Sequence, residues 1–180
     1  MPAATAAWPR ATRWRCFRRS RAGNVIRVQE QDFDVGAEID GLGGGDRSIG
    51  GIASFIGLVR DMAGGQRIRA MTLEHYPAMT ERELKRIEAD ARARWPLQAS
   101  LVIHRYGRLE PGDRIVFVAT ASAHRQAAFE SCMFLVDWLK TKAPFWKLEE
   151  TGAGAEWVAA KASDDDAAER WSRPAKKAAE

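Results

Sequence analysis

The sequence predicts a single domain of the α+β class, with mixed and antiparallel strands and one long helix. A length of 180 residues suits one domain with a substantial hydrophobic core. Most strand-like segments are joined by short, hairpin-like connections, whereas a regular βαβ array would alternate strands with helices. The long helical pattern follows Ser122 and stops before Pro144, because proline disfavours helical geometry in the residue that precedes it.

The composition, with 46% hydrophobic and 29% charged residues, is that of an ordinary soluble globular protein. No segment approaches the roughly 20 consecutive apolar residues of a membrane-spanning helix. Cys16 and Cys132 have neither metal-binding nor redox spacing, and we expect Cys132 to be a buried free thiol. Nothing indicates a disulfide-rich secreted protein, so the expected location is the cytoplasm. No His, Cys, Asp or Glu set has metal-ligand spacing, so we expect no metal site.

Positive charge is concentrated at the N-terminus. Residues 1–24 contain six arginines and no acidic residue, out of 28 basic and 24 acidic residues in the chain; residues 25–180 therefore hold 22 basic and 24 acidic side chains, a net charge of −2. A nucleic-acid-binding domain usually carries its positive charge on the folded part. We interpret residues 1–24 as a disordered or artefactual basic extension, with a transit peptide as the alternative. The catalytic domain is expected over residues 25–171, and a frayed tail over 172–180.

Alternating apolar residues predict the elements of the first half. The expected elements are strands at residues 25–30, 49–60 and 68–76, a short helix at 34–42, and a flexible loop at 61–66. The glycines around residues 43–51 match no phosphate-binding loop pattern. Thr80 and Glu83 form a capping box, which predicts a helix from there to Trp95. Its inward residues are expected to be Leu84, Ile87, Ala91 and Trp95.

The second half is expected to continue with strands and the long helix. The predicted strands are at residues 99–106 and 114–121, joined through the turn sequence EPGD, and at 147–151 and 156–161 around a Gly-Ala-Gly turn. Ser163 and Asp166 predict the cap of a last short helix that ends near Trp171.

Residues 122–147 form the most informative stretch for function. If Ser122 is the N-cap, His124 and Arg125 lie in the first turn, where unpaired backbone N–H groups already favour an anion. Helical spacing predicts an inward apolar stripe that consists of Phe129, Met133, Val136 and Leu139, with Lys140 on or beside it. Phe145 and Trp146 are expected to hold Lys147 in place. This combination points to a site for an anionic substrate.

The individual residues also have structural interpretations. A lysine beside an apolar face is desolvated and can act in proton transfer or as a nucleophile, but it can also extend its stem over apolar surface and keep its charge in water. Arg60, at the end of a strand, is either an anion ligand or a solvated arginine. We interpret His75 and His104, which lie within strands, as structural.

The length of the helix constrains the site. Arg125 and Lys140 are fifteen residues apart, or about 22 Å at a rise of 1.5 Å per residue. One small substrate cannot easily bridge both residues within one chain. The simplest arrangement is a two-fold dimer in which His124 and Arg125 of one protomer meet Lys140 and Lys147 of the other.

Several segments together resemble the large, catalytic subunit of molybdopterin synthase. They are TLEHYPAMTE (residues 72–81), RWPL (94–97), IHRYGRLEPGD (103–113), SAHR (122–125), DWLKTKAPFWKLE (137–149) and WVAAKASDDDAAERW (157–171). The segments follow the expected order over nearly all of residues 25–171. The resemblance implies an α/β hammerhead-type fold and a homodimer. It also implies that each protomer binds a small, ubiquitin-like sulfur-carrier subunit, which gives a heterotetramer.

The resemblance further implies an activity and a site. The C-terminal Gly-Gly thiocarboxylate of the carrier would transfer sulfur to cyclic pyranopterin monophosphate, forming the dithiolene of molybdopterin, with no cofactor resident in the protein. The catalytic lysines of the family map onto Lys140 and Lys147. Its substrate contacts map onto these lysines and onto Leu58, Val59, Arg60, His124, Arg125, Leu148 and Glu149.

One residue departs from the family pattern. Leu58 stands where the family often has a basic residue, so a contact there would come from the backbone alone. The alternative function is a non-enzymatic module that binds a phosphometabolite or nucleic acid.

Overall fold

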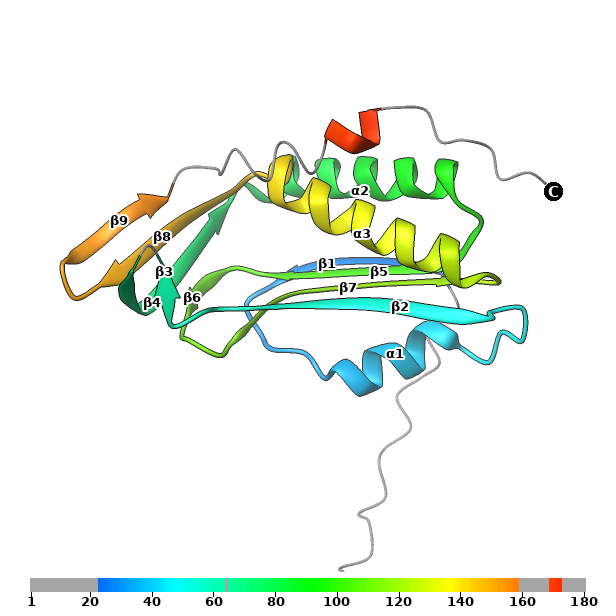
Figure 1. Ribbon diagram of the computed structural model, residues 1–180, viewed down its shortest axis with the longest axis horizontal. Helices are drawn as coiled ribbons and strands as arrows, with labels where there is room; N and C mark the ends of the chain where they lie inside the picture. The colour runs from blue at the N-terminus through cyan, green and yellow to red at the C-terminus, as the bar shows by residue number, and fades with distance from the viewer. Residues whose placement is uncertain (1–22, 64, 159–168, 173–180) are drawn as a thin grey trace, which may run out of the picture.

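The computed structural model describes residues 23–63, 65–158 and 169–172, in which two β-sheets and three α-helices are arranged as Figure 1 shows. The first sheet has four strands in the order β1-β5-β7-β2. They are β1 (Asn24–Gln29), β5 (Leu97–Arg105), β7 (Arg114–Ser122) and β2 (Gly51–Leu58). β1 runs parallel to β5, and the other neighbours are antiparallel. The predicted α+β class is therefore confirmed.

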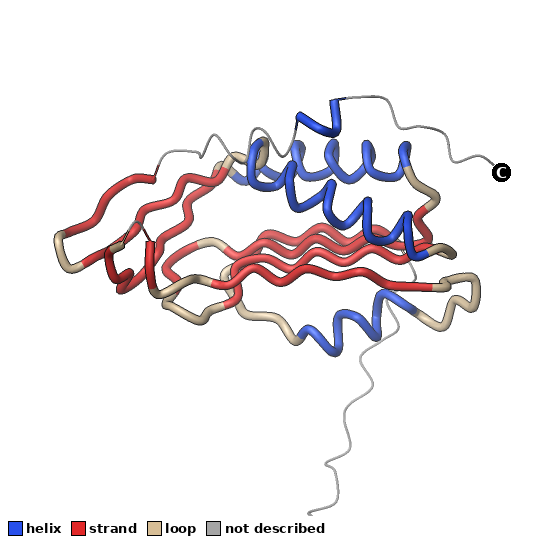
Figure 2. Tube along the Cα trace, viewed as in Figure 1, coloured by secondary structure: helices blue, strands red, loops and turns tan. Residues whose placement is uncertain are grey.

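The second sheet lies at one end of the first, on the left in Figures 1 and 2. Its strands are β3 (Met62–Ala63), β4 (Gln66–His75), β8 (Phe145–Thr151) and β9 (Gly154–Val158), and β6 (Gly107–Leu109) pairs with β4. β6 was not predicted from the sequence. Residues 61–66 were predicted to be a flexible loop, whereas Met62 and Ala63 pair with Arg67 and Gln66 in a hairpin.

Helices cover both faces of the first sheet (Figure 2). α2 (Pro77–Arg94) and α3 (Arg125–Thr141) pack on one face around a core that includes Leu84, Ile87, Val118 and Phe134. α1 (Val35–Gly43) covers the other face over Leu101, Ile103 and Phe117. The residues of β5 contribute to both cores, because successive side chains of a strand point to opposite faces of the sheet.

The start of α2 corrects the predicted capping box. The helix begins at Pro77, whose fixed φ suits the first helical position, and Tyr76 is the N-cap. Thr80 lies inside the helix and is fully buried. The predicted inward face is confirmed, because Leu84, Ile87, Ala91 and Trp95 are all buried.

The start of α3 also differs from the prediction. Ser122 is the last residue of β7, paired with both Gly51 and Leu97, and its Oγ donates to the Pro96 carbonyl at 2.9 Å. The N-cap is His124. A Cβ added at Gly50 would lie 2.1 Å from the Ala123 carbonyl oxygen, so glycine is required where this loop passes the turn into α3.

The predicted apolar stripe of α3 is only partly correct: Leu139 is buried and Val136 packs against the core, but the other two residues point outward. Phe129 and Met133 are 65% and 50% exposed, whereas the neighbouring stripe packs on the sheet. That buried stripe consists of Ala128, Cys132, Leu135 and Leu139. Both stripes have helical spacing, so periodicity alone could not distinguish them. Cys132 is a buried free thiol as predicted, and burial raises its pKa to about 11.

The C-terminal predictions lie partly outside the described residues. β9 ends at Val158, so residues 159–161 of the predicted strand and the predicted cap at Ser163 and Asp166 are not covered. A 3₁₀ turn at Arg170–Ser172 packs against the helices. The Trp171 ring centroid lies 5.6 Å from that of Phe134, and Trp171 Nε1 donates to Asp137 at 2.7 Å. Within the described residues, no helix is long and apolar enough to cross a membrane.

Candidate functional site

Lys147 occupies a central position in the second sheet. It lies on β8 between Leu73 of β4 and Val158 of β9, and its Nζ is 2.8 Å from Oε1 of Glu149. The two side chains are 31% and 15% exposed. Residues two apart on a strand face the same side, so the carboxylate orients the ammonium along one face of the sheet. Both residues were predicted as substrate contacts from the family resemblance. Their pairing was not predicted, although the alternation of a strand could have indicated it.

The end of β2 reaches the same side of this sheet. Val59 is buried in an apolar cluster with Met71 and Leu73, which pair with Glu149 and Lys147. The Val59 N–H donates to the Asp113 carbonyl at 2.9 Å, and the Gly112 N–H donates to the Val59 carbonyl at 2.8 Å. The predicted EPGD turn therefore fixes the backbone of this strand end. Directly beyond it, Arg60 is exposed.

The remaining predicted residues around β8 are divided between its faces. Leu148 and Trp146 point away from the side of Lys147. Trp146 is 43% exposed and its ring makes an edge contact with Tyr76, at 5.3 Å between centroids. Phe145 shares the face of Lys147 and stacks on His104. Of the two predicted anchors, only Phe145 is positioned to support Lys147.

Lys140 lies in the last turn of α3, just before the connection into β8. It is exposed in the single chain, so the expectation of a lysine desolvated by the apolar stripe is wrong at this level of assembly. Lys140 is exposed because it lies on the outward face of α3, which it shares with Phe129 and Met133. Lys140 and Lys147 thus flank one helix-to-strand connection.

His124 and Arg125 lie at the opposite end of the molecule. Both are exposed at the start of α3. The register of β2 and β7 pairs Gly51 with Ser122 and Leu58 with Arg114, so Leu58 and the second sheet are at the other end of the first sheet. The structure therefore packs Val59 on the side of Lys147, with the exposed Arg60 next in sequence, and it separates His124 and Arg125 from them within one chain.

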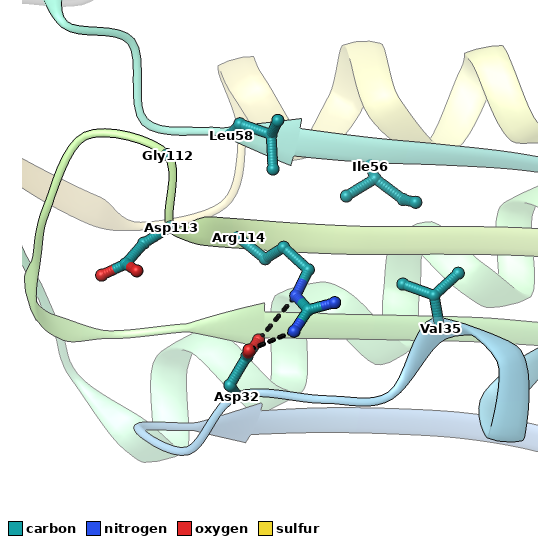
Figure 3. A pocket seen from close by; sticks show the side chains of 7 residues that line it. All are labelled: Asp32, Val35, Ile56, Leu58, Gly112, Asp113 and Arg114. Atoms are coloured by element: carbon teal, nitrogen blue, oxygen red, sulfur yellow. Dashed lines mark hydrogen bonds and ion pairs between the residues drawn. The ribbon is translucent and has the colours of Figure 1, made fainter. Parts of the chain in front are cut away.

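A surface pocket lies apart from this lysine site. It has a volume of about 520 Å³ and lies between α1 and the exposed end of β2 (Figure 3). Apolar residues Ile56, Leu58 and Val35 line one part of it, and an Arg114–Asp32 ion pair lies at its rim. This hydrogen-bonded arginine lowers the pKa of Asp32. Leu58 points into this pocket, which contains neither Lys140 nor Lys147.

Within the described residues, no group of three or more His, Cys, Asp or Glu side chains could hold a metal ion. The candidate site consists of lysines, an arginine and a carboxylate. An ammonium and a guanidinium can bind phosphate and carboxylate-like anions through charge-assisted hydrogen bonds. They can also stabilise negative charge that develops during group transfer.

Comparison with known proteins identifies the family. The model of the family described as MoaE protein matches residues 28–142. The chain belongs to the MoaE family. The predicted resemblance is thereby confirmed.

MoaE relatives cover most of this chain at high identity. The molybdopterin synthase catalytic subunit of Pseudomonas aeruginosa is 53% identical over 147 residues, which are 82% of this chain and 98% of that protein. The molybdopterin synthase catalytic subunit of Escherichia coli is 51% identical over 150 residues, or 83% and 99%. A solved MoaE structure from Burkholderia ambifaria is 48% identical, covers 83% of this chain and 99% of that one, and superposes with a TM-score of 0.72.

Burial of His104 predicts a pH-dependent stability. Burial lowers the pKa of His104 from 6.5 to about 4. Between pH 6.5 and pH 4, His104 is therefore protonated in the unfolded chain but neutral in the folded chain. The free energy of unfolding should fall by about 2 kcal/mol between pH 8 and pH 5 through this residue alone. Urea unfolding at both pH values, compared with His104→Phe, measures this difference; parallel pH dependences in the two proteins would contradict it.

Proposed function

We propose that this MoaE-family chain is the catalytic subunit of a molybdopterin synthase, and that it transfers sulfur from a small carrier subunit to cyclic pyranopterin monophosphate. The observation that carries the proposal is the Lys147–Glu149 pair beside the end of β2, with Lys140 at the end of the preceding helix. This geometry supplies positive charge and a carboxylate beside the connection from α3 into β8.

The residues have separate roles in this proposal. Arg60, together with His124 and Arg125 of the second protomer, binds the cyclic phosphate and the pterin. Lys147 and Lys140 bind the thiocarboxylate and stabilise the oxyanions that develop during transfer. In each transfer a carbon–sulfur bond forms on the pterin substrate as a carbon–oxygen bond there breaks. That oxygen equivalent replaces the sulfur of one thiocarboxylate, so the carrier leaves as a carboxylate. Two carriers supply the two sulfurs of the dithiolene.

The proposed assembly begins with a homodimer. Exposed apolar side chains cluster on β2, an edge strand, and on the outward face of α3, which packs beside it. On the side of α3 they are Phe55, Phe129 and Met133, whereas Ile52, Ile56 and Leu58 point to the side of α1 from the same edge strand. An apolar surface of this kind is typical of a protein interface. A second copy would cover it and supply the His124 and Arg125 that each site lacks.

The second partner is a small, ubiquitin-like carrier with a C-terminal Gly-Gly thiocarboxylate, one for each protomer. The name of the relatives, catalytic subunit, supports an assembly with another kind of subunit. The proposed location is the cytoplasm, since a buried free thiol such as Cys132 is compatible with a reducing compartment. The roles assigned above require no resident cofactor.

The test supplies the purified chain with thiocarboxylated carrier and cyclic pyranopterin monophosphate. Formation of molybdopterin, measured by fluorescence of its oxidised derivative, is the expected result. Omission of the thiocarboxylate, with unmodified carrier in its place, is the control. Binding of the phosphorylated pterin without any product would instead support the non-enzymatic alternative.

A further inference from the structure

Two histidines, the buried His104 and the half-buried His75, lie where the first sheet meets the start of β8. The ring of His104, near the end of β5, is parallel to that of Phe145, with 3.8 Å between centroids and 13° between planes. His75, the last residue of β4, pairs with Phe145 across the strands. Its ring centroid lies 5.7 Å from that of Phe145 and 4.6 Å from that of Tyr106. Aromatic rings from both sheets thus surround the first residue of β8.

A hydrogen bond fixes the ring of His104, whereas a nitrogen of the His75 ring has no hydrogen-bond partner within the described residues. His104 Nδ1 lies 2.8 Å from the Arg105 carbonyl oxygen. A carbonyl can only accept, so this nitrogen carries the hydrogen and the ring is locked to the backbone of β5. Within the described residues, Nδ1 of His75 is buried without a hydrogen-bond partner. Such an unsatisfied group costs stability, and its presence calls for an explanation other than folding.

Both rings are neutral at neutral pH. Burial lowers the pKa of each histidine. Glu81 of α2 opposes this effect at His75, and the two histidines disfavour each other's protonation. A neutral imidazole can lie flat against a phenyl ring as another aromatic ring does.

The position of Phe145 determines where Lys147 is presented. Phe145 follows Pro144 directly, so it is the first residue of the connection to be held by the sheet. Phe145 and Lys147 are two residues apart on β8 and therefore face the same side. A shift of Phe145 along or away from β5 would move the Lys147 ammonium with it. Misplacement of a reacting group by about 1 Å can cost about 100-fold in rate.

We propose that His104 and His75 are positioning residues for sulfur transfer, which clamp Phe145 between the two sheets and thereby hold Lys147 toward the substrate. The inference rests on the proposed function, because it takes Lys147 as the group that meets the thiocarboxylate. Neither histidine touches the reacting atoms in this account. His104 supplies the rigid surface, since β5 is an inner strand of its sheet, and His75 closes the clamp from β4.

Two substitutions separate stacking from hydrogen bonding. His104→Phe retains a flat ring but loses the bond to the Arg105 carbonyl. His104→Asn retains a donor at the same distance from the backbone but loses the ring. If stacking positions Lys147, His104→Phe should keep kcat within about threefold of wild type. His104→Asn should lower kcat by about tenfold to 100-fold, with KM for the pterin substrate changed by less than about threefold. Equal kcat in the two variants, or a loss confined to KM, would overturn the proposal.

A second variant and a structural measurement keep the test decisive. If His104→Asn does not fold, Phe145→Leu removes stacking from the other side and should give the same loss in kcat. NMR of the Lys147 amide and side chain should show large shift changes in His104→Asn and Phe145→Leu and small ones in His104→Phe. Unchanged Lys147 shifts in all three would also refute the clamp. A wild-type protein that makes no molybdopterin would refute the proposed function, and the NMR comparison would still test the clamp.

Discussion

Lys147→Ala is expected to lower sulfur transfer by about 100-fold to 1000-fold, a loss of the size seen when a group that stabilises developing charge is removed. The ammonium is held by Glu149 at 2.8 Å, on the side of the sheet that faces the end of β2. Alanine would remove the charge and leave the strand pairing with Leu73 and Val158 intact. Turnover of thiocarboxylated carrier under saturating substrate is the measurement.

The control for Lys147→Ala is the same substitution at a nearby lysine that lies on the surface outside the second sheet. Lys142, the C-cap of α3, is exposed and lies 5.9 Å from the centroid of the Trp138 ring. Lys142→Ala should leave turnover within about threefold of wild type, and both variants should keep the free energy of unfolding within about 1 kcal/mol, as partly exposed substitutions usually do. Full turnover by Lys147→Ala would exclude this lysine from the chemistry.

Phe129→Asp is expected to separate the proposed dimer and, with it, to abolish most of the activity. The Phe129 side chain is 65% exposed on the outward face of α3, next to Met133 and the edge strand β2. A carboxylate buried there without a partner would cost several kcal/mol in the assembly and little in the monomer. Analytical ultracentrifugation should show a folded monomer, and turnover should fall by at least about 100-fold because each site loses His124 and Arg125.

Met79→Asp is a matched control for this substitution. Met79 is also a large exposed apolar residue, but it lies on α2, away from the face shared by α3 and β2. The Met79→Asp protein should remain dimeric and active. A Phe129→Asp protein that is still dimeric, or that is monomeric and fully active, would show that this face does not complete the site.

The sequence predicted much of the fold because its local signals agreed with the tertiary structure. Strand alternation, the EPGD turn and the inward face of α2 are all found as expected. The errors arose where two local signals competed. Pro77 determines the start of α2 in place of Thr80, because a fixed φ suits the first turn. Pairing of Ser122 in β7 likewise displaces the start of α3 to His124 as N-cap.

The candidate site was predictable in its residue types and only partly in its geometry. The length of the predicted helix was enough to predict that Arg125 and Lys140 lie far apart. In the structure they are at opposite ends of α3. The residues of α3 that face the sheet were only partly predicted, because the buried residues 128, 132, 135 and 139 have helical spacing, as do the predicted residues 129, 133, 136 and 139. The stacking of His104 on Phe145 joins residues of two sheets, and no short-range pattern indicates such a contact.

A mixed dimer tests most directly whether each active site is built from two protomers. Lys147→Ala and Arg125→Ala chains with different affinity tags would be co-expressed, and the heterodimer isolated through both tags. Each parent homodimer should be nearly inactive. The heterodimer combines an intact Lys147 with an intact Arg125 at one of its two sites, so it should show about half of the wild-type turnover. A heterodimer as inactive as its parents would contradict the account, because both residues would then serve the same site from the same chain.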